Sequence, residues 1–107
     1  MSSPFEHLAE LDRLIHEPAR LAILTALSSC GSADFLYLRR LTGLTKGNLS
    51  AHLAKLEHAG LIVISKGYVG KVPNTTVRIT REGTTDVKAH WKSLAQLRKR
   101  SLEWQPE

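Results

Sequence analysis

Hydrophobic residues recur at every third or fourth position over much of the chain, a spacing that predicts amphipathic helices. The first run consists of Phe5, Leu8, Leu11 and Ile15. It predicts a helix that stops near His16.

A second helix is predicted to begin at Pro18, because a proline in the first turn of a helix gives up no hydrogen bond. Its apolar face contains Leu21, Leu24 and Leu27. The small and polar residues at 28–31 mark its end.

Two further helices are predicted on either side of a tight turn. The shorter one is capped by Ser32 or Asp34 and ends at Gly43, which suits a left-handed turn. The longer one begins at Thr45, a good N-cap, and has an apolar stripe on one side. That stripe is Leu49, Leu53 and Leu56. A short helix, a tight turn and a striped second helix are the parts of a helix-turn-helix, here at about 34–60.

Two strands are predicted after this pair of helices. Residues 61–64 and 75–80 are rich in β-branched side chains and flank a loop of turn-forming residues at 67–74. A long helix from about 82 to about 103 follows. The predicted fold class is therefore mainly α with a small β-hairpin, in a single domain over residues 1–107. The hairpin, at about 61–80, stands where a winged helix-turn-helix has its wing.

The net charge of +5 is concentrated in the middle of the chain. Residues 45–81 carry six basic side chains and only one acidic one, Glu57. The basic residues are Lys46, Lys55, Lys66, Lys71, Arg78 and Arg81. A local excess of this kind is what a polyanion-binding surface requires, although solvated surface charge has the same composition.

The predicted helix at 45–59 has the residue types of a DNA-reading helix. In a helix-turn-helix the second helix enters the major groove, and its outward residues near the N-terminus reach the bases. Lys46 suits a phosphate or a guanine, Asn48 suits an adenine, and Gly47 is small enough for the backbone to approach the duplex. The candidate residues are Thr45, Lys46, Gly47, Asn48, Ser50, Ala51, His52 and Lys55. For His52 two interpretations stay open, a phosphate contact and a place at the edge of the core.

The predicted wing supplies three more basic candidates, Lys66, Lys71 and Arg78. We expect the segment 66–78 to lie along the DNA backbone or the adjacent minor groove. Lysine and arginine there add affinity that is independent of sequence and sensitive to salt.

Residues 38–62 resemble the winged helix-turn-helix core of MarR-like and ArsR-like transcriptional regulators. The segment LEHAGLI at 56–62, followed by ITREG at 79–83, is similar to the LExxGLI and LTxxG frame of that superfamily. The compact winged-helix DNA-binding domain subgroup is the most similar, over roughly residues 10–95. The resemblance implies a recognition helix in the major groove and a homodimer joined through the terminal helices.

The apolar stripes on the two terminal helices are wide for so small a domain, which favours burial against a second copy. The candidate interface residues are Phe5, Leu8, Leu11, Ile15, Trp91, Leu94 and Leu102. Trp91 and Trp104 have a second interpretation, as the lining of a ligand pocket.

Other classes of function find little support. The chain shows no phosphate-binding glycine loop, nucleophile motif or paired acids, so we expect no enzyme. Cys30 is the only cysteine and the five histidines are scattered, so we expect no metal site and no cofactor. No secretory signal and no membrane span are apparent, and we expect a cytoplasmic protein.

We therefore expect a sequence-specific regulator that binds double-stranded DNA as a homodimer and acts as a repressor. One alternative is a winged-helix adaptor that docks a protein on the same helix. Another is a sensor gated by a metal or a small-molecule effector, which no residue pattern in the sequence supports.

Overall fold

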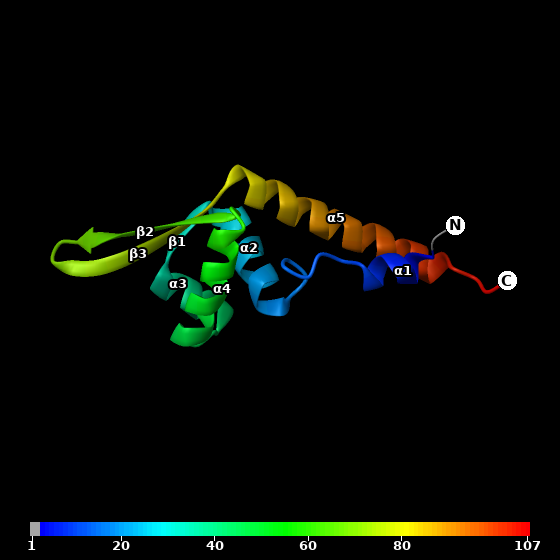
Figure 1. Ribbon diagram of the computed structural model, residues 1–107, viewed down its shortest axis with the longest axis horizontal. Coiled ribbons are helices and arrows are strands. Elements are labelled where there is room, and N and C mark those ends of the chain that lie inside the picture. The colour runs from blue at the N-terminus through cyan, green and yellow to red at the C-terminus, as the bar shows by residue number, and fades with distance from the viewer. Residues whose placement is uncertain (1–2) are drawn as a thin grey trace.

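Five helices and three strands follow one another in the computed structural model, which describes residues 3–107. They are α1 (Pro4–Ala9), α2 (Pro18–Cys30), β1 (Ser32–Asp34), α3 (Phe35–Thr42), α4 (Lys46–His58), β2 (Ile62–Val69), β3 (Val72–Ile79) and α5 (Arg81–Glu103). Figure 1 shows α2, α3 and α4 grouped beside the base of the β2–β3 hairpin, which extends to one side. On the other side α5 runs outward to meet α1. The predicted fold class, mainly helical with a wing, is confirmed.

The sheet has three antiparallel strands in the order β1-β3-β2, one strand more than the sequence predicted. The short β1 places Ala33 opposite Val77 of β3. Asp34 ends β1 opposite Thr76 and also caps α3, because its Oδ1 accepts a hydrogen bond from the backbone N–H of Tyr37 at 2.7 Å. The base of the hairpin and the first helix of the helix-turn-helix are thus joined through one residue.

The hairpin is longer than predicted, and most of the expected loop at 67–74 is strand. β2 and β3 pair continuously from Ile62 opposite Ile79 to Val69 opposite Val72, so only residues 70–71 form the turn. β1 covers β3 only along residues 76–78. The outer part of the hairpin therefore has free edges, where Pro73 is tolerated.

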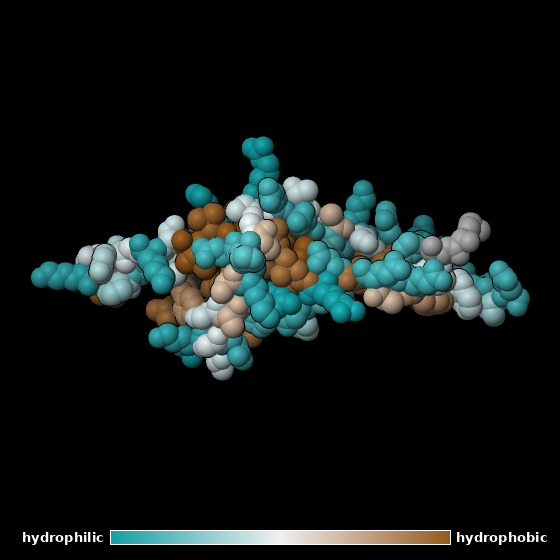
Figure 2. Space-filling view, viewed as in Figure 1, coloured by the Kyte–Doolittle hydropathy of each residue, from teal (hydrophilic) through white to brown (hydrophobic). Residues whose placement is uncertain are grey.

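The core lies between the helices of the body and the base of the sheet. Its largest fully buried side chains are Ile23, Leu24, Leu27, Leu38, Leu49, Leu56, Ile62, Val77 and Val87. Hydrophobic burial of this kind is the main force that holds α2, α3 and α4 against the sheet. Figure 2 shows hydrophobic residues gathered where the hairpin meets the helices, and hydrophilic residues along most of the visible surface of α5.

The prediction of one helix over residues 5–15 is wrong. α1 ends at Ala9, and the connector that follows turns at Asp12, whose Oδ1 accepts from the backbone N–H of Leu14 at 2.9 Å. This turn carries Ile15 into the core, where it is 3% exposed. Ile15 is therefore removed from the predicted partner interface, because its side chain is already buried within its own chain.

α1 and the C-terminal end of α5 form an arm that projects from the body (Figure 1). The rings of Phe5 and Trp104 meet edge to face, with centroids 5.2 Å apart. Nearer the body, Trp91 Nε1 donates to Thr25 Oγ1 of α2 at 2.9 Å and fixes the direction of α5. The radius of gyration of 16.6 Å is well above the value of about 13 Å expected for a compact chain of this length.

Candidate nucleic-acid interface

α4 begins at a capped N-terminus, as the sequence predicted. Thr45 Oγ1 accepts a hydrogen bond from the backbone N–H of Asn48 at 3.1 Å. Gly43 ends α3 with a φ of 70°, the left-handed conformation that glycine adopts without strain. Arg39 Nε donates to the carbonyl of Leu44 at 3.4 Å and supports the turn between the two helices.

The two sides of α4 are sharply different. Leu49, Leu53 and Leu56 are 0%, 2% and 0% exposed and pack into the core. The opposite side is open to solvent, and it contains Lys46, Gly47, Asn48, Ser50, Ala51 and Lys55. Thr45 at the cap is exposed as well. The structure therefore brings seven of the eight predicted helix residues onto one accessible surface with unpaired N–H groups at its N-terminal end.

A cleft of about 480 Å³ separates α4 from the inner face of the hairpin. Lys46 and Ser50 line it from α4, and Lys66 and Thr75 line it from the strands. Glu57 also lies there, where its carboxylate accepts from the backbone N–H of Ile64 at 3.3 Å. Two lysines from different elements thus face the same channel, which is a suitable arrangement for a phosphate backbone.

The three wing candidates do not lie together. Lys71 is in the turn at the far end of the hairpin, and Lys66 is opposite Thr75 partway along it. Arg78 pairs with Val63 and Ser32 near the base. Because side chains alternate along a strand, Arg78 lies on the other face of the sheet from Lys66 and away from the cleft.

His52 differs from the other helix candidates because its ring is turned toward α2. Its Nδ1 lies 3.1 Å from Arg20 Nη1 and 3.7 Å from Glu17 Oε2. Burial raises the pKa of the Glu17 carboxyl, but backbone N–H groups of Arg20 and Ala19 and the basic side chains of His52 and Arg20 outweigh it. The net pKa shift of Glu17 is downward.

Arg20 is the residue of this surface that sequence reasoning missed. It is 9% exposed and lies directly behind the recognition helix. A signal was present, because Arg20 shares the apolar face of α2 with Ile23, Leu24 and Leu27 at helical spacing. An arginine on such a face is rarely buried without partners.

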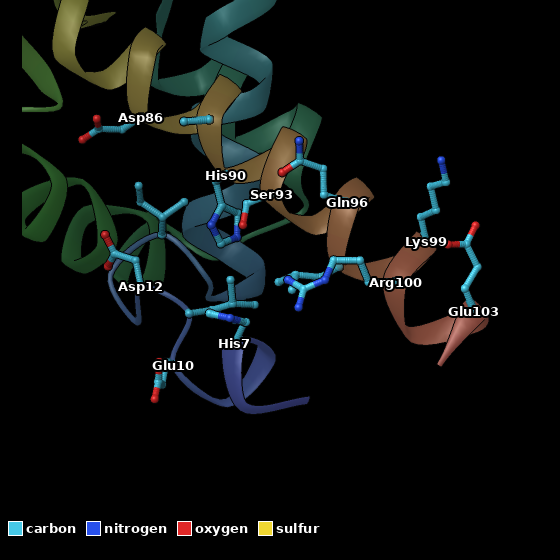
Figure 3. Close-up of a pocket in the computed structure, with 14 residues that line it drawn as sticks. His7, Glu10, Asp12, Asp86, His90, Ser93, Gln96, Lys99, Arg100 and Glu103 are labelled. Carbon is cyan, nitrogen blue, oxygen red and sulfur yellow. The ribbon is translucent and has the colours of Figure 1, made fainter. Parts of the chain in front are cut away.

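Six of the seven residues predicted for a partner interface lie on α1, on the connector after it or along α5. Phe5, Leu8, Trp91 and Leu102 are exposed, and Leu11 and Leu94 are partly buried. A crevice of about 850 Å³ opens between the connector, α1 and α5. Figure 3 shows its charged and polar lining, with His7 from α1 and Arg100 from α5 on opposite walls.

At the inner end of this crevice two histidines meet. His16 Nδ1 lies 3.1 Å from His90 Nε2, and the ring centroids are 5.2 Å apart. Burial lowers the pKa of His90, and His16 lowers it further, whereas Asp12 acts in the opposite direction. Within residues 3–107 no group of three or more histidine, cysteine or acidic side chains is arranged to hold a metal ion. The same residues include no helix with the length and apolar character needed to span a bilayer.

Comparison with known proteins identifies the family of the chain. Residues 19–98 match the family model described as a winged helix DNA-binding domain. An uncharacterized protein of Methanocaldococcus jannaschii is 31% identical over 87 residues, which are 81% of this chain and 95% of that protein.

Solved structures with the same fold are transcriptional regulators. A transcriptional regulator homologue from Pyrococcus horikoshii OT3 is 28% identical, with a TM-score of 0.81 over 90% of this chain and 94% of that one. NadR, solved in complex with 4-hydroxyphenylacetate, is 20% identical, with a TM-score of 0.70 over 92% of this chain and 69% of that one. This family and this fold are those of transcriptional regulators and not of enzymes. The chain belongs to the winged helix DNA-binding domain family, and its fold is that of the MarR-like and ArsR-like regulators.

Proposed function

We propose that the protein is a dimeric repressor that binds a specific sequence of double-stranded DNA. The observation that carries this proposal is the division of α4 into a buried leucine face and an exposed face of small and polar residues. A helix whose outward side has no bulky residue fits closely into the major groove. Repression follows most simply, because occupancy of a promoter needs no further surface on the protein.

The residues of α4 divide into two roles in this proposal. Asn48 and Lys46, near the N-terminus, read base edges, because amide and ammonium groups match adenine and guanine in the major groove. Thr45, Ser50 and Lys55 contact phosphates and fix the orientation of the helix. Gly47 and Ala51 let the helix backbone approach the bases.

The wing supplies contacts that do not depend on sequence. The cleft between α4 and the hairpin accepts one strand of the phosphate backbone between Ser50 and Lys66. Lys71 then reaches the next part of the duplex from the hairpin turn. Arg78, on the other face of the sheet, makes no contact with the same strand.

The arm, together with the adjoining part of α5, is the proposed dimer surface. Leu102 is 71% exposed and Trp91 48% exposed, which is unfavourable for an isolated chain. A second copy related by a two-fold axis buries these residues together with Phe5 and Leu8, and pairs the two recognition helices. The two half-sites are then about one helical turn apart, roughly 34–36 Å.

Selection of bound sequences from a random duplex pool, followed by salt-titrated gel shifts, tests the proposal. We expect a pseudo-palindromic site, bound at least about a thousand-fold more tightly than random DNA. Lys46→Ala is expected to lower this preference. Lys88→Ala, a change at an exposed lysine of α5 outside the proposed surfaces, serves as the matched control. Absence of duplex binding at low ionic strength contradicts the proposal, and equal binding of all sequences contradicts its specificity.

The crevice between α1 and α5 favours a second role, the binding of a small-molecule effector. Its volume of about 850 Å³ lies within the range of known ligand sites. Its lining combines Arg100 and Lys99 with four carboxylates, so a small acid that also has a cationic group suits it. A thermal-shift screen with a panel of small carboxylic acids tests this role. A rise in melting temperature that disappears in Arg100→Ala supports it, and no shift with any acid contradicts it.

A further inference from the structure

Arg20 is a buried cation that joins three parts of the chain. Its Nε donates to the carbonyl of Leu14 at 2.6 Å, and its Nη2 donates to the carbonyl of Arg13 at 3.2 Å. Its Nη1 is 3.1 Å from His52 Nδ1 and 3.9 Å from the Glu17 carboxylate. Arg20, whose side chain is 11% exposed, thus joins the segment before α2 to the recognition helix α4.

The chemistry of arginine fixes the role of the histidine in this contact. A guanidinium has only donors and keeps its proton under all ordinary conditions, so it cannot accept a hydrogen bond from a ring N–H. The 3.1 Å contact therefore requires a lone pair on His52 Nδ1. A neutral imidazole with an acceptor at Nδ1 carries its proton on Nε2.

We propose that Arg20 is a positioning residue for DNA binding, which holds His52 as the Nε2–H tautomer so that the ring donates to a DNA phosphate. This inference rests on the proposed function, because it assigns a DNA contact to α4. His52 lies on the helix one turn after Asn48 and is partly exposed, so the ring reaches the surface beside the base-reading residues. Nδ1 accepts a hydrogen bond from Arg20, so Nε2–H is the only donor that the ring can offer to DNA.

The proposal combines the two interpretations of His52, the edge of the core and a phosphate contact. The Nδ1 side of the ring is part of a partly buried network at the edge of the core. The side chain is 22% exposed, and the proposal assigns its Nε2 side to the DNA. Lysine at position 20 would keep the charge but has no planar fork, so it cannot reach two carbonyls and the imidazole together.

The tautomer can be read directly in the free protein. Long-range proton–nitrogen correlation spectra of the ¹⁵N-labelled full chain distinguish an unprotonated Nδ1 from an unprotonated Nε2. We expect His52 to have a protonated Nε2 near neutral pH, and this preference to be lost in Arg20→Lys. His58, exposed at the end of α4, is the internal control and is expected not to change. A protonated Nδ1 in the native protein, or an unchanged His52 spectrum in Arg20→Lys, overturns the proposal.

A double-mutant cycle tests the consequence for DNA. Each of His52→Ala and Arg20→Lys is expected to weaken binding about tenfold on cognate and random duplexes alike, because a phosphate contact carries no sequence information. The double variant is expected to bind no more weakly than either single variant. Arg20→Lys combined with Lys71→Ala is the control pair and is expected to be additive.

The outcomes separate this proposal from the proposed function. Additive losses for Arg20→Lys and His52→Ala show that Arg20 does not act through His52. If the native protein binds no duplex at all, the proposed function fails while the spectra still decide the tautomer. If Arg20→Lys does not fold, the spectrum of the native protein alone decides whether Nε2 carries the proton.

Discussion

Gly83 packs against the backbone carbonyl of Leu61 so closely that no Cβ atom fits between them. The first turn of α5 is held there by Thr80, whose backbone N–H donates to Leu61 O at 3.0 Å and whose hydroxyl donates to Gly60 O at 2.8 Å. This close approach sets the point where α5 leaves the sheet.

Gly83→Ala is therefore expected to destabilise the fold by about 3 kcal/mol, because the added methyl meets backbone that cannot move aside. Urea unfolding followed by circular dichroism measures the change. Gly31→Ala is no suitable control, since Gly31 has a φ of 78°. Gly47→Ala is suitable, because its added Cβ meets nothing within 4 Å. Equal stability of the two variants would contradict the expected clash.

Gly47→Ala is expected to separate folding from DNA binding. Alanine stabilises an exposed helix position by about 0.5–1 kcal/mol relative to glycine, so the folded state gains slightly. The same methyl group stands on the surface proposed to face the bases, and affinity for the selected duplex is expected to fall at least about tenfold. Fluorescence anisotropy with the duplex measures this loss. Unchanged affinity would show that DNA does not approach the backbone at this position.

We expect two different effects on DNA binding from three single substitutions, Lys46→Ala, Asn48→Ala and Lys71→Ala. The first two are expected to lose about 1–3 kcal/mol of discrimination between the selected site and random DNA. Lys71→Ala is expected to weaken all duplexes alike and to lower the salt slope of binding by about one. Binding isotherms on both DNAs at several salt concentrations measure the difference. Equal losses on both DNAs for all three variants would reject this division of roles.

Leu102→Glu is expected to shift the protein from dimer to monomer, because it places a charge in the proposed apolar interface of the arm. Leu36→Glu is the matched control, since Leu36 is 66% exposed and Leu102 is 71% exposed, but Leu36 lies on α3, away from the arm. Sedimentation equilibrium gives the mass of each variant. A monomeric native protein, or a dimeric Leu102→Glu variant, would contradict this interface.

Stability is expected to decrease as the solution is acidified through the titration range of His90. Burial and the neighbouring His16 hold the pKa of His90 below its ordinary value of 6.5 in the folded protein. Between the unfolded and folded pKa values the unfolded chain binds more protons, so stability rises with pH and is lost as the pH falls. Urea unfolding near pH 7.5 and near pH 5.5 measures the loss, which is expected to be smaller in His90→Gln. An equal loss in both proteins would assign the effect to other groups.

The helix-turn-helix could be predicted from the sequence because its signals are local. Thr45 as N-cap, Gly43 as the left-handed end of α3 and the leucine stripe of α4 each depend on residues within a few positions of one another. A local signal of this kind, a proline in the first helical turn, also predicted that α2 begins at Pro18. The exposed side of the recognition helix then followed from its buried side.

The features that were missed depend on contacts between distant residues. β1 is three residues long and exists only because it pairs with β3, more than forty positions later. Ile15 continued the helical spacing of the first run, but the turn at Asp12 sends it to the core while Phe5 stays on the arm. The contact between Arg20 and His52 spans 32 positions, so no short pattern contains it.

The double role of Asp34 has a mechanical consequence. Because one residue both closes β1 against the base of the hairpin and caps α3, we expect the base of the wing and the helix-turn-helix to tilt together. We therefore expect the distance between the N-terminus of α4 and the base of the hairpin to stay constant when the protein binds DNA. A duplex must then adjust its groove width to match that distance. Sites with easily deformed base steps are bound more tightly, even at positions that no side chain contacts.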